Sequence, residues 1–285
     1  MSAFNSKMIS KPVEMQSLSD QWILGKKTIG FVPTMGALHQ GHLELVRASR
    51  KQNKRTVVSI YVNPLQFGPN EDFSKYPRTL EADLRLLEKE KVDLVFTPSN
   101  KEMYPRGFST QVNVTGPIVQ GLCAPFRSGH FDGVATIVVK LLAAVQPTRL
   151  YLGQKDAQQA ALLKKVIVDL NIKVKPVVCP IVREHDGLAM SSRNVRLTLA
   201  GRKVAPVLYK GLRVGKSVFE LGETDAKKVL GEIRKVIRGE RKVRLQYLEA
   251  VDSETLAPAD KIKPGTMLAL AAYLDTIRLI DNIIV

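Results

Sequence analysis

Two histidines three residues apart flank a glycine in the segment PTMGALHQGH, residues 33–42. His39 and His42 can each donate an imidazole N–H to a phosphate oxygen. Gly41 has no Cβ, so a nucleotide can approach the backbone closely there. If the segment leads into a helix, the free amides and the dipole of the first turn attract an anion to the same place. The pattern favours nucleotide binding over a pair of surface or metal-binding histidines.

A second segment, MSSRN at Met190–Asn194, carries two hydroxyls and a guanidinium in succession. Ser191 and Ser192 are adaptable donors and acceptors, whereas Arg193 offers a planar fork of donors. Together these groups can surround a triphosphate. The tripeptide Ser-Ser-Arg alone is common in loops, so its significance depends on the histidine segment.

Two more segments carry polar side chains that could bind parts of a nucleotide or a small acid. In GQKDAQQ, Lys155 can neutralise a phosphate and Asp156 can accept hydrogen bonds from ribose hydroxyls. In VNPLQFG, the neutral amides of Asn63 and Gln66 can bind a carboxylate or a hydroxyl without adding charge. Capping a turn is an alternative role for Asn63, whereas Gln66 has no such local role.

Strand-like and helix-like patterns alternate through the first two-thirds of the chain and position these segments. The predicted strands are Thr28–Val32, Thr56–Val62, Val92–Phe96, Arg149–Leu152 and Val174–Val178. The predicted helices are Gly41–Gln52, Thr79–Glu90 with Thr79 as N-cap, Gly133–Val145 and Ala157–Leu170. Continuous apolar strands separated by helices indicate an α/β fold, a Rossmann-like parallel sheet with helices on both faces. Such sheets bind ligands at the carboxyl ends of their strands, where the histidine, lysine and amide segments lie.

The pattern changes beyond about Val182. The predicted helices there are Ala200–Glu220 and Ala226–Ile237, and the predicted strands are Val243–Val251, Met267–Tyr273 and Ile277–Ile283. Helices followed by an antiparallel meander predict a smaller α+β domain with a short antiparallel sheet. We therefore expect a Rossmann-like domain over residues 1–181 and a C-terminal domain over 182–285.

Composition narrows the function class. The 285 residues include 43 Lys and Arg against 27 Asp and Glu, a formal net charge of +16. The two cysteines lack metal-ligand spacing, and neither a secretory signal nor a membrane-length apolar run is present, which is typical of a cytoplasmic enzyme. An RNA-binding module is the alternative, based on basic clusters at Arg47–Arg55 and Arg234–Arg244. Solvated helix faces are favoured for both, because neither cluster has interleaved aromatic residues.

The four segments, with YPRT from Tyr76 and GHFDG from Gly129, resemble the pantothenate synthetase (pantoate–β-alanine ligase) family, within the H-x-G-H nucleotidyltransferase superfamily. The likeness runs from Phe31 to Thr198 and again through Thr276–Asn282. Phosphopantetheine and mononucleotide adenylyltransferases share H-x-G-H and are the alternative enzyme classes. They would not need the two glutamines, Gln66 and Gln159, in their present motifs.

The resemblance implies a two-step ligase with ATP as substrate and Mg²⁺ as cofactor. ATP and pantoate would give pantoyl adenylate and pyrophosphate, and β-alanine would then displace AMP to give pantothenate. A cytoplasmic homodimer is implied, with no specific nucleic acid and no membrane as partner. Because acyl adenylates hydrolyse readily, we expect the C-terminal domain to act as a lid, with the Ser191–Arg193 loop at its hinge.

The resemblance also assigns residues. The implied ATP site is Met35, Gly36, Ala37, Leu38, His39, Gln40, Gly41, His42, Gly153, Gln154, Lys155, Asp156, Val182, Met190, Ser191, Ser192 and Arg193. The implied pantoate and β-alanine site is Gln66 and Gln159, with Asn63, Tyr76, Arg127 and His130 lining or closing the cavity. The groups expected to stabilise phosphate charge are His39, His42, Lys155 and Arg193.

Four positions raise particular questions. His42 corresponds to the family's proton donor, but a helix N-terminus disfavours an imidazolium, so we expect a neutral imidazole that donates a hydrogen bond. Gln154 replaces a usual glutamate and Ala157 an aromatic residue; neither change removes a phosphate ligand, so activity should survive. The magnesium ligands stay unassigned. Asp83 is a weak candidate and is better interpreted as a solvated helix residue.

Overall fold

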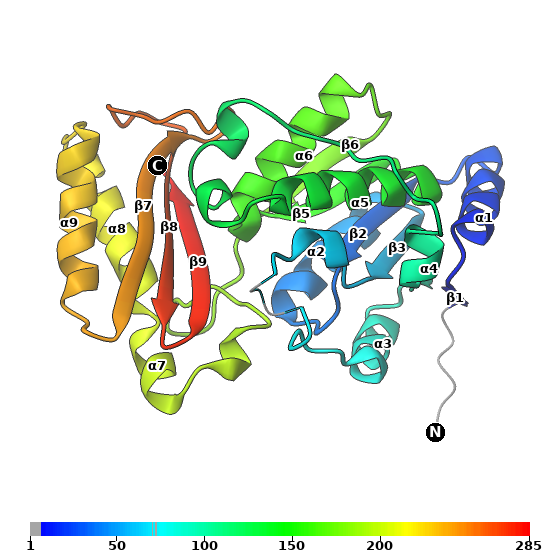
Figure 1. Ribbon diagram of the computed structural model, residues 1–285, viewed down its shortest axis with the longest axis horizontal. Helices are drawn as coiled ribbons and strands as arrows, with labels where there is room; N and C mark the ends of the chain where they lie inside the picture. Colours follow the sequence, from blue (N-terminus) through cyan, green and yellow to red (C-terminus); the bar gives the residue numbers. More distant parts are fainter. Residues whose placement is uncertain (1–6, 70, 72) are drawn as a thin grey trace. The chain divides into compact units, whose positions relative to one another are not determined.

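The computed structural model describes residues 7–69, 71 and 73–285 (Figure 1). Within these residues, a six-stranded parallel sheet is accompanied by a three-stranded antiparallel sheet, which confirms the predicted fold class. The parallel sheet has the order β1 (Lys7–Ile9), β4 (Leu94–Phe96), β3 (Arg55–Ile60), β2 (Ile29–Thr34), β5 (Arg149–Gly153) and β6 (Lys175–Cys179). Because the strand order reverses between β2 and β5, the loops after these two strands border the crevice where such sheets bind ligands.

Four of the helices between these strands, over residues 40–52, 80–89, 130–145 and 157–169, fall close to their predicted positions. The helices of this part are α1 (Pro12–Leu24), α2 (Gln40–Gln52), α3 (Leu80–Lys89), the short α4 (Asn100–Met103), α5 (His130–Val145) and α6 (Ala157–Asp169). Sequence patterns missed β1, α1 and the single-turn α4. The strand has only three residues, and the buried side chains of α1 are Met15 and Ser19, which is too little apolar periodicity to detect.

The parallel sheet is apolar on both faces. Val32 and Val58 pack in one cluster with Leu45 of α2, so this helix covers one face. Phe31 and Val57 are also fully buried, and successive strand residues point to opposite faces. Burial on both faces explains why the strands read as continuous apolar runs.

The C-terminal part contains helices followed by a meander, as predicted. Its elements are α7 (Leu199–Val204), α8 (Val207–Glu220), α9 (Ala226–Arg238), β7 (Val243–Asp252), β8 (Thr266–Leu274) and β9 (Ile277–Ile284). The prediction of one helix over Ala200–Glu220 was wrong, because Pro206 separates α7 from α8. Proline has no amide hydrogen for the helical ladder and restricts the residue before it.

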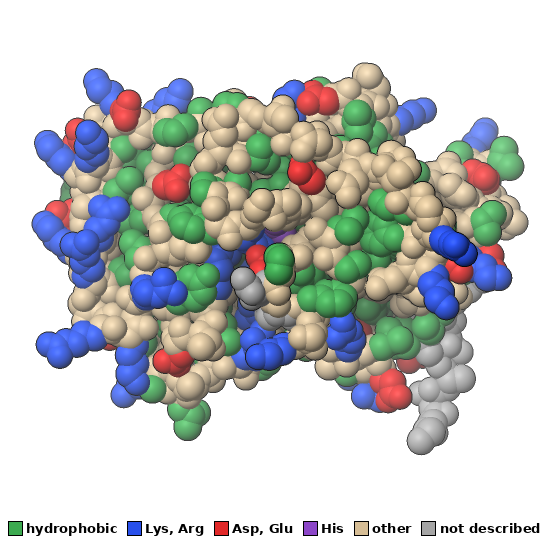
Figure 2. Space-filling model, in the orientation of Figure 1, with side chains coloured by type: hydrophobic (Ala, Val, Ile, Leu, Met, Phe, Trp, Pro, Cys, Tyr) green, Lys and Arg blue, Asp and Glu red, His purple; other side chains and the backbone are tan. Residues whose placement is uncertain are grey.

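Helix α9 is strongly amphipathic. Its buried residues include Val229 and Ile233, whereas Lys228, Lys235 and Arg238 are exposed. Figure 2 shows Lys and Arg side chains gathered over this helix. The part of the Arg234–Arg244 cluster within α9 therefore includes exposed residues of a helix whose other face is in the core, which agrees with the solvated-face interpretation for that part.

The chain forms two compact units. The first unit is residues 1–114, 127–154 and 162–180, and the second unit is residues 115–126, 155–161 and 181–285. The domain boundary between residues 181 and 182 stays a prediction. Among the described residues, no helix combines the length and apolar character needed to span a bilayer.

Candidate active site

The histidine segment forms the connection from β2 to α2 in the first unit. Gly36 and Ala37 have positive φ angles of 83° and 50°, so the chain turns sharply after the strand. A Cβ at Gly36 would lie 3.0 Å from a carboxylate oxygen of Asp83, so both the backbone angle and the close packing favour glycine. Helix α2 then begins at Gln40, with His39 as its N-cap.

The two imidazoles cap this helix reciprocally. His39 Nδ1 accepts a hydrogen bond from the Gly41 amide at 3.2 Å, and His42 Nδ1 accepts one from the His39 amide at 3.4 Å. Their ring centroids are 4.1 Å apart. A nitrogen that accepts from an amide carries no proton, so each ring fits the neutral tautomer protonated on Nε2. This geometry supports the prediction of a neutral donor.

Asp83 lies beneath the same loop and is buried, with 2% of its surface exposed. Its Oδ2 accepts from the Ala37 amide at 2.9 Å, and its Oδ1 accepts from the Leu38 amide at 2.8 Å. The hydroxyl of Thr79, the N-cap residue of α3, donates to the same carboxylate at 3.3 Å and caps no amide of its own helix. Interpreting Asp83 as a solvated helix residue was therefore wrong.

A cavity of about 330 Å³ borders the histidine loop, at the carboxyl ends of β2, β3 and β4. Met35 and Gly36 from the loop and Asp83 from α3 contribute to its wall. The other lining residues are Ile60, Tyr61, Val62, Phe73, Arg78, Thr79, Leu80, Thr97, Pro98 and Asn100. The sequence-based prediction that ligands bind beyond the strand ends agrees with this position.

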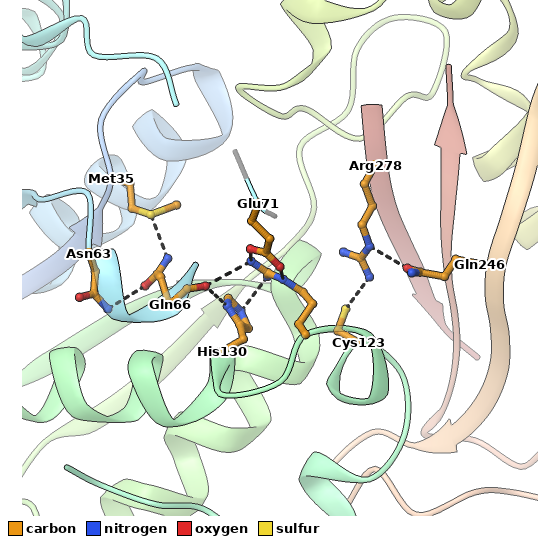
Figure 3. A network of polar contacts seen from close by, with 9 residues as sticks. Met35, Asn63, Gln66, Glu71, Cys123, His130, Gln246 and Arg278 are labelled. Atoms are coloured by element: carbon orange, nitrogen blue, oxygen red, sulfur yellow. Dashed lines mark hydrogen bonds and ion pairs between the residues drawn. The ribbon is translucent and has the colours of Figure 1, made fainter. Parts of the chain in front are cut away.

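Gln66 lies in a short 3₁₀ turn, Pro64–Gln66, after β3 (Figure 3). Its side-chain amide donates to Met35 Sδ at 2.9 Å and accepts from Asn63 Nδ2 at 3.4 Å. Tyr104 donates to Asn63 Oδ1 at 2.7 Å. Asn63 Oδ1 also accepts from the Leu65 amide, so this residue both caps the turn and contacts Gln66. The histidine loop and the amide segment are thus adjacent, as predicted.

His130 and Arg127 surround the backbone of Gln66. His130 Nδ1 donates to the Gln66 carbonyl at 2.7 Å, and His130 Nε2 accepts from the Arg127 guanidinium at 2.8 Å. Arg127 also forms a two-pronged ion pair with Glu71, at 2.7 and 2.5 Å (Figure 3). Both predicted substrate residues therefore act on the Gln66 turn through direct contacts, and their predicted contact with substrate stays a prediction.

The same turn packs closely against α5. A Cβ at Gly133 would lie 2.2 Å from the Leu65 carbonyl oxygen, so only glycine fits at this position. On the loop that follows, Tyr76 is buried and its ring meets Phe67 edge-on at 6.0 Å between centroids. The Gln66 side chain is thereby held by close packing as well as by hydrogen bonds.

In the second unit, residues 182–190 fold into a tight hairpin. The Val182 carbonyl accepts from the Met190 amide at 3.0 Å, which brings together two predicted ATP-binding residues at the two ends of the hairpin. Ser191 Oγ then accepts from the Arg193 amide at 3.2 Å. Ser191, Ser192 and Arg193 are half-buried directly after the hairpin.

Ion pairs and stacking hold this hairpin. Arg183 forms two hydrogen bonds with Asp281 of β9, at 2.7 and 3.0 Å, and donates to the Gly187 carbonyl at 3.0 Å. Its guanidinium lies 3.5 Å from the centroid of the Tyr209 ring. Burial raises the pKa of Asp281, while the Arg183 guanidinium acts in the opposite direction. Arg202 of α7 adds ion pairs to two acidic residues of the hairpin, Glu184 and Asp186.

Strand β9 also holds the segment that carries Lys155. The side-chain amide of Asn282 donates to the Lys155 carbonyl at 3.1 Å. Lys155 Nζ lies 3.4 Å from Asp156 Oδ1, and the Asp156 side chain is half exposed. Neighbouring residues of one strand, Asp281 and Asn282, therefore hold the hairpin that precedes Ser191–Arg193 and the segment that carries Lys155.

Gln158, one residue before the predicted pantoate ligand Gln159, has a structural role. It accepts from the Cys123 amide at 2.8 Å and donates to two carbonyls of the same loop. Arg278 donates to Cys123 Sγ at 3.2 Å and to Gln246 at 2.8 Å (Figure 3). These contacts fix the N-terminal turn of α6, on which the half-buried Gln159 stands.

The predicted site residues divide between the two units. Those of the first unit are Met35, Gly36, Ala37, Leu38, His39, Gln40, Gly41, His42, Asn63, Gln66, Tyr76, Arg127, His130, Gly153 and Gln154. Those of the second unit are Lys155, Asp156, Gln159, Val182, Met190, Ser191, Ser192 and Arg193. Sequence reasoning gave no supporting role to Asp281, Asn282 or Glu71, and it misjudged Asp83. For Asp83 a signal existed, since it lies four residues before buried Leu87 on the inner face of α3.

Comparison with known sequences and structures gives a consistent result. The profile of a family described as pantoate–β-alanine ligase matches residues 7–284. The pantothenate synthetase of Caldicellulosiruptor saccharolyticus is 50% identical over 278 residues, which cover 98% of this chain and 99% of that protein. The pantothenate synthetase of Acetivibrio thermocellus is 54% identical over 259 residues, covering 91% and 92%.

Solved structures agree with the sequences. A crystal structure of pantothenate synthetase from Thermus thermophilus matches with a TM-score of 0.92 at 43% identity, covering 97% of this chain and 98% of that chain. A crystal structure of pantoate–β-alanine ligase from Francisella tularensis, described as complexed with β-γ ATP and β-alanine, matches with a TM-score of 0.80 at 34% identity, covering 98% and 97%.

Proposed function

Because the chain belongs to the pantoate–β-alanine ligase family, we propose that it joins pantoate to β-alanine with ATP, through an enzyme-bound pantoyl adenylate. The observation that carries this proposal is the reciprocal capping of α2 by His39 and His42. Each Nδ1 accepts from a backbone amide, which places the ring proton on Nε2, a donor suited to a phosphate oxygen.

In the first step, a carboxylate oxygen of pantoate attacks the α-phosphorus of ATP. A new P–O bond forms, and the bond from the α-phosphorus to the bridging oxygen breaks, so pyrophosphate leaves. No protein nucleophile is needed, because the substrate supplies its own. His39, His42, Lys155 and Arg193 stabilise the negative charge that develops on the phosphates.

In the second step, the amine of β-alanine attacks the acyl carbon of the adenylate. The C–N bond forms, the C–O bond to AMP breaks, and the amine loses a proton. Gln66 is suited to bind a hydroxyl or carboxylate group, because Met35 and Asn63 orient its buried side-chain amide. Asn63 lines this position and is itself held by Tyr104 and the Gly133 carbonyl. Gln159 serves as a further contact to pantoate.

The function requires both units to act on one ATP molecule. The histidine loop of the first unit and the Ser191–Arg193 segment of the second bind its phosphates, and closure of the second unit as a lid shields the adenylate from water. The active species is a cytoplasmic homodimer, as the family resemblance implies, with no specific nucleic acid as partner.

Magnesium accompanies the nucleotide in this proposal. No group of three or more acidic, histidine or cysteine side chains suited to hold a metal ion occurs within residues 7–69, 71 and 73–285. Mg²⁺ commonly keeps several waters and binds mainly to substrate phosphates, so an ion carried by ATP fits this chain. It would neutralise part of the charge on the triphosphate.

The direct test supplies ATP, pantoate and β-alanine to the purified chain. We expect AMP and pantothenate in equal amounts, and without β-alanine we expect pantoyl adenylate to stay bound. Isotope exchange between pyrophosphate and ATP should require pantoate. Exchange that requires phosphopantetheine or a mononucleotide instead would contradict the proposal in favour of another nucleotidyltransferase. RNA retained on a filter at physiological salt would support the RNA-binding alternative, unless retention falls steeply as salt rises.

A further inference from the structure

The carboxylate of Asp83 is shared between two consecutive backbone amides of the histidine loop. Oδ2 accepts from Ala37 and Oδ1 from Leu38, at 2.9 and 2.8 Å, so each oxygen has its own donor. Thr79 donates to both oxygens and fixes the plane of the carboxylate. Hydrogen bonds to an ionised acceptor are about twice as strong as neutral ones.

The contact is made at the strained point of the loop. Ala37 has a φ of 50°, which is unfavourable for a residue with a Cβ. The amides of Ala37 and Leu38 come directly before His39, the N-cap of α2 and the acceptor for Gly41. A change in the backbone at Ala37 therefore moves both imidazoles, because His42 in turn accepts from the His39 amide.

We propose that Asp83 is a positioning residue for adenylate formation: it fixes the left-handed turn of the loop, and through it the direction of both histidines towards the triphosphate. The inference rests on the proposed function. Asp83 is 2% exposed and both oxygens are bonded to amides, so its role is to hold the loop and not to ligate Mg²⁺.

The sharpest variant is Asp83→Asn, which keeps size and shape. Asparagine has one acceptor oxygen, so its NH₂ group must face one of the two amides, donor against donor. The matched control is Glu81→Gln, which removes the same charge from an exposed position in the same helical turn. A loop displaced by about 1 Å is expected to slow its reaction about 10²-fold.

The two half-reactions separate positioning from general damage. For Asp83→Asn we expect pantoate-dependent exchange between pyrophosphate and ATP to fall about 10²-fold. Formation of pantothenate from supplied pantoyl adenylate and β-alanine should fall by no more than about threefold, since no triphosphate is held in that step. Glu81→Gln should leave both rates unchanged. Equal losses in both half-reactions would show a merely structural role and overturn the proposal, as would recovery of the first rate on raising Mg²⁺.

Amide hydrogen exchange gives a measurement independent of catalysis. In Asp83→Asn, the Ala37 and Leu38 amides should exchange at least about tenfold faster, while the core of β2 keeps its protection. Unchanged protection at both amides would overturn the proposal. If the wild-type chain fails to form pantoyl adenylate, the proposed function fails, and hydrogen exchange alone then decides whether Asp83 anchors the loop.

Thr79→Val provides a second variant in case Asp83→Asn does not fold. It leaves both amide contacts and removes only the hydroxyl that orients the carboxylate. We expect a several-fold loss of pyrophosphate–ATP exchange, with the second half-reaction unaffected. Equal losses in the two half-reactions, or no loss in either, would count against the positioning role.

Discussion

The histidine loop of the first unit and the 182–190 hairpin of the second, both assigned to ATP in the proposed function, are held in different ways. The loop is bound by a single carboxylate, that of Asp83, which lies on α3 and not on the helix that the loop begins. The hairpin is held by Asp281 and Arg202, each through its own ion pair, and by Asn194, which donates to Glu184. The loop therefore depends on one charged residue, whereas the hairpin depends on several.

The difference follows from how each region is encoded. The loop is a strand, a glycine turn and a capped helix, which are all local features, so only its exact direction needs outside help. The hairpin depends on partners such as Asp281, almost a hundred residues away in sequence. Its shape is therefore a property of the folded second unit.

The largest effect is expected in the histidine loop itself. His42→Ala should lower pantoate-dependent pyrophosphate–ATP exchange about 10³-fold, because a donor to the developing phosphate charge is lost. His42→Gln keeps a neutral donor and should retain clearly more activity, measured in the same exchange assay. If His42→Gln lost as much as His42→Ala, the interpretation of His42 as a neutral hydrogen-bond donor would fail.

Asp281→Asn removes a partner of the hairpin and should act mainly on the stability of the folded chain. It leaves the Arg183 charge without its buried counter-charge, and we expect the free energy of unfolding in urea to fall by about 3 kcal/mol. Asp260→Asn, at an exposed acid of the same unit, is the control. If the folded Asp281→Asn enzyme lost pyrophosphate–ATP exchange as severely as Asp83→Asn, the claim that several contacts share the task of holding the hairpin would fail.

Gly133→Ala tests the packing behind Gln66 and should cost about 2 kcal/mol in thermal unfolding, because the new methyl overlaps the Leu65 carbonyl. Gly231→Ala in α9 is the matched control: its Cβ meets nothing within 4 Å, so alanine should stabilise that helix slightly. Equal stability of the two variants would mean that the turn can move away from α5.

The smallest effect is expected at Arg202→Gln. The Arg202 side chain is about a quarter exposed, so its two ion pairs should contribute no more than about 1 kcal/mol. Urea unfolding at low and high salt measures this, and the difference from wild type should shrink as salt rises. A loss of several kcal/mol would show that Arg202 alone holds the hairpin.

The sequence predicted five strands of the parallel sheet, four of its helices and the C-terminal meander, because these elements are long enough to show apolar runs or periodicity. It also predicted that the histidine and amide segments meet, since both follow strands of one parallel sheet. It could not predict which side chains hold these segments. Helical spacing places Asp83 on the inner face of α3, but the donors that hold Asp83 and Asp281 are distant in the chain, and no local pattern identifies them. Pro206 was visible in the sequence and should have divided the predicted helix.

The central claim is that the histidine loop and the Ser191–Arg193 segment bind one triphosphate. A double-mutant cycle of His42→Ala and Arg193→Ala, measured by kcat/KM for pantoate-dependent pyrophosphate–ATP exchange, tests it directly. If both side chains act on the same phosphates, the double variant should lose far less than the product of the two single losses. Losses that multiply, with free energies additive to within about 0.5 kcal/mol, would show two independent sites and contradict the account.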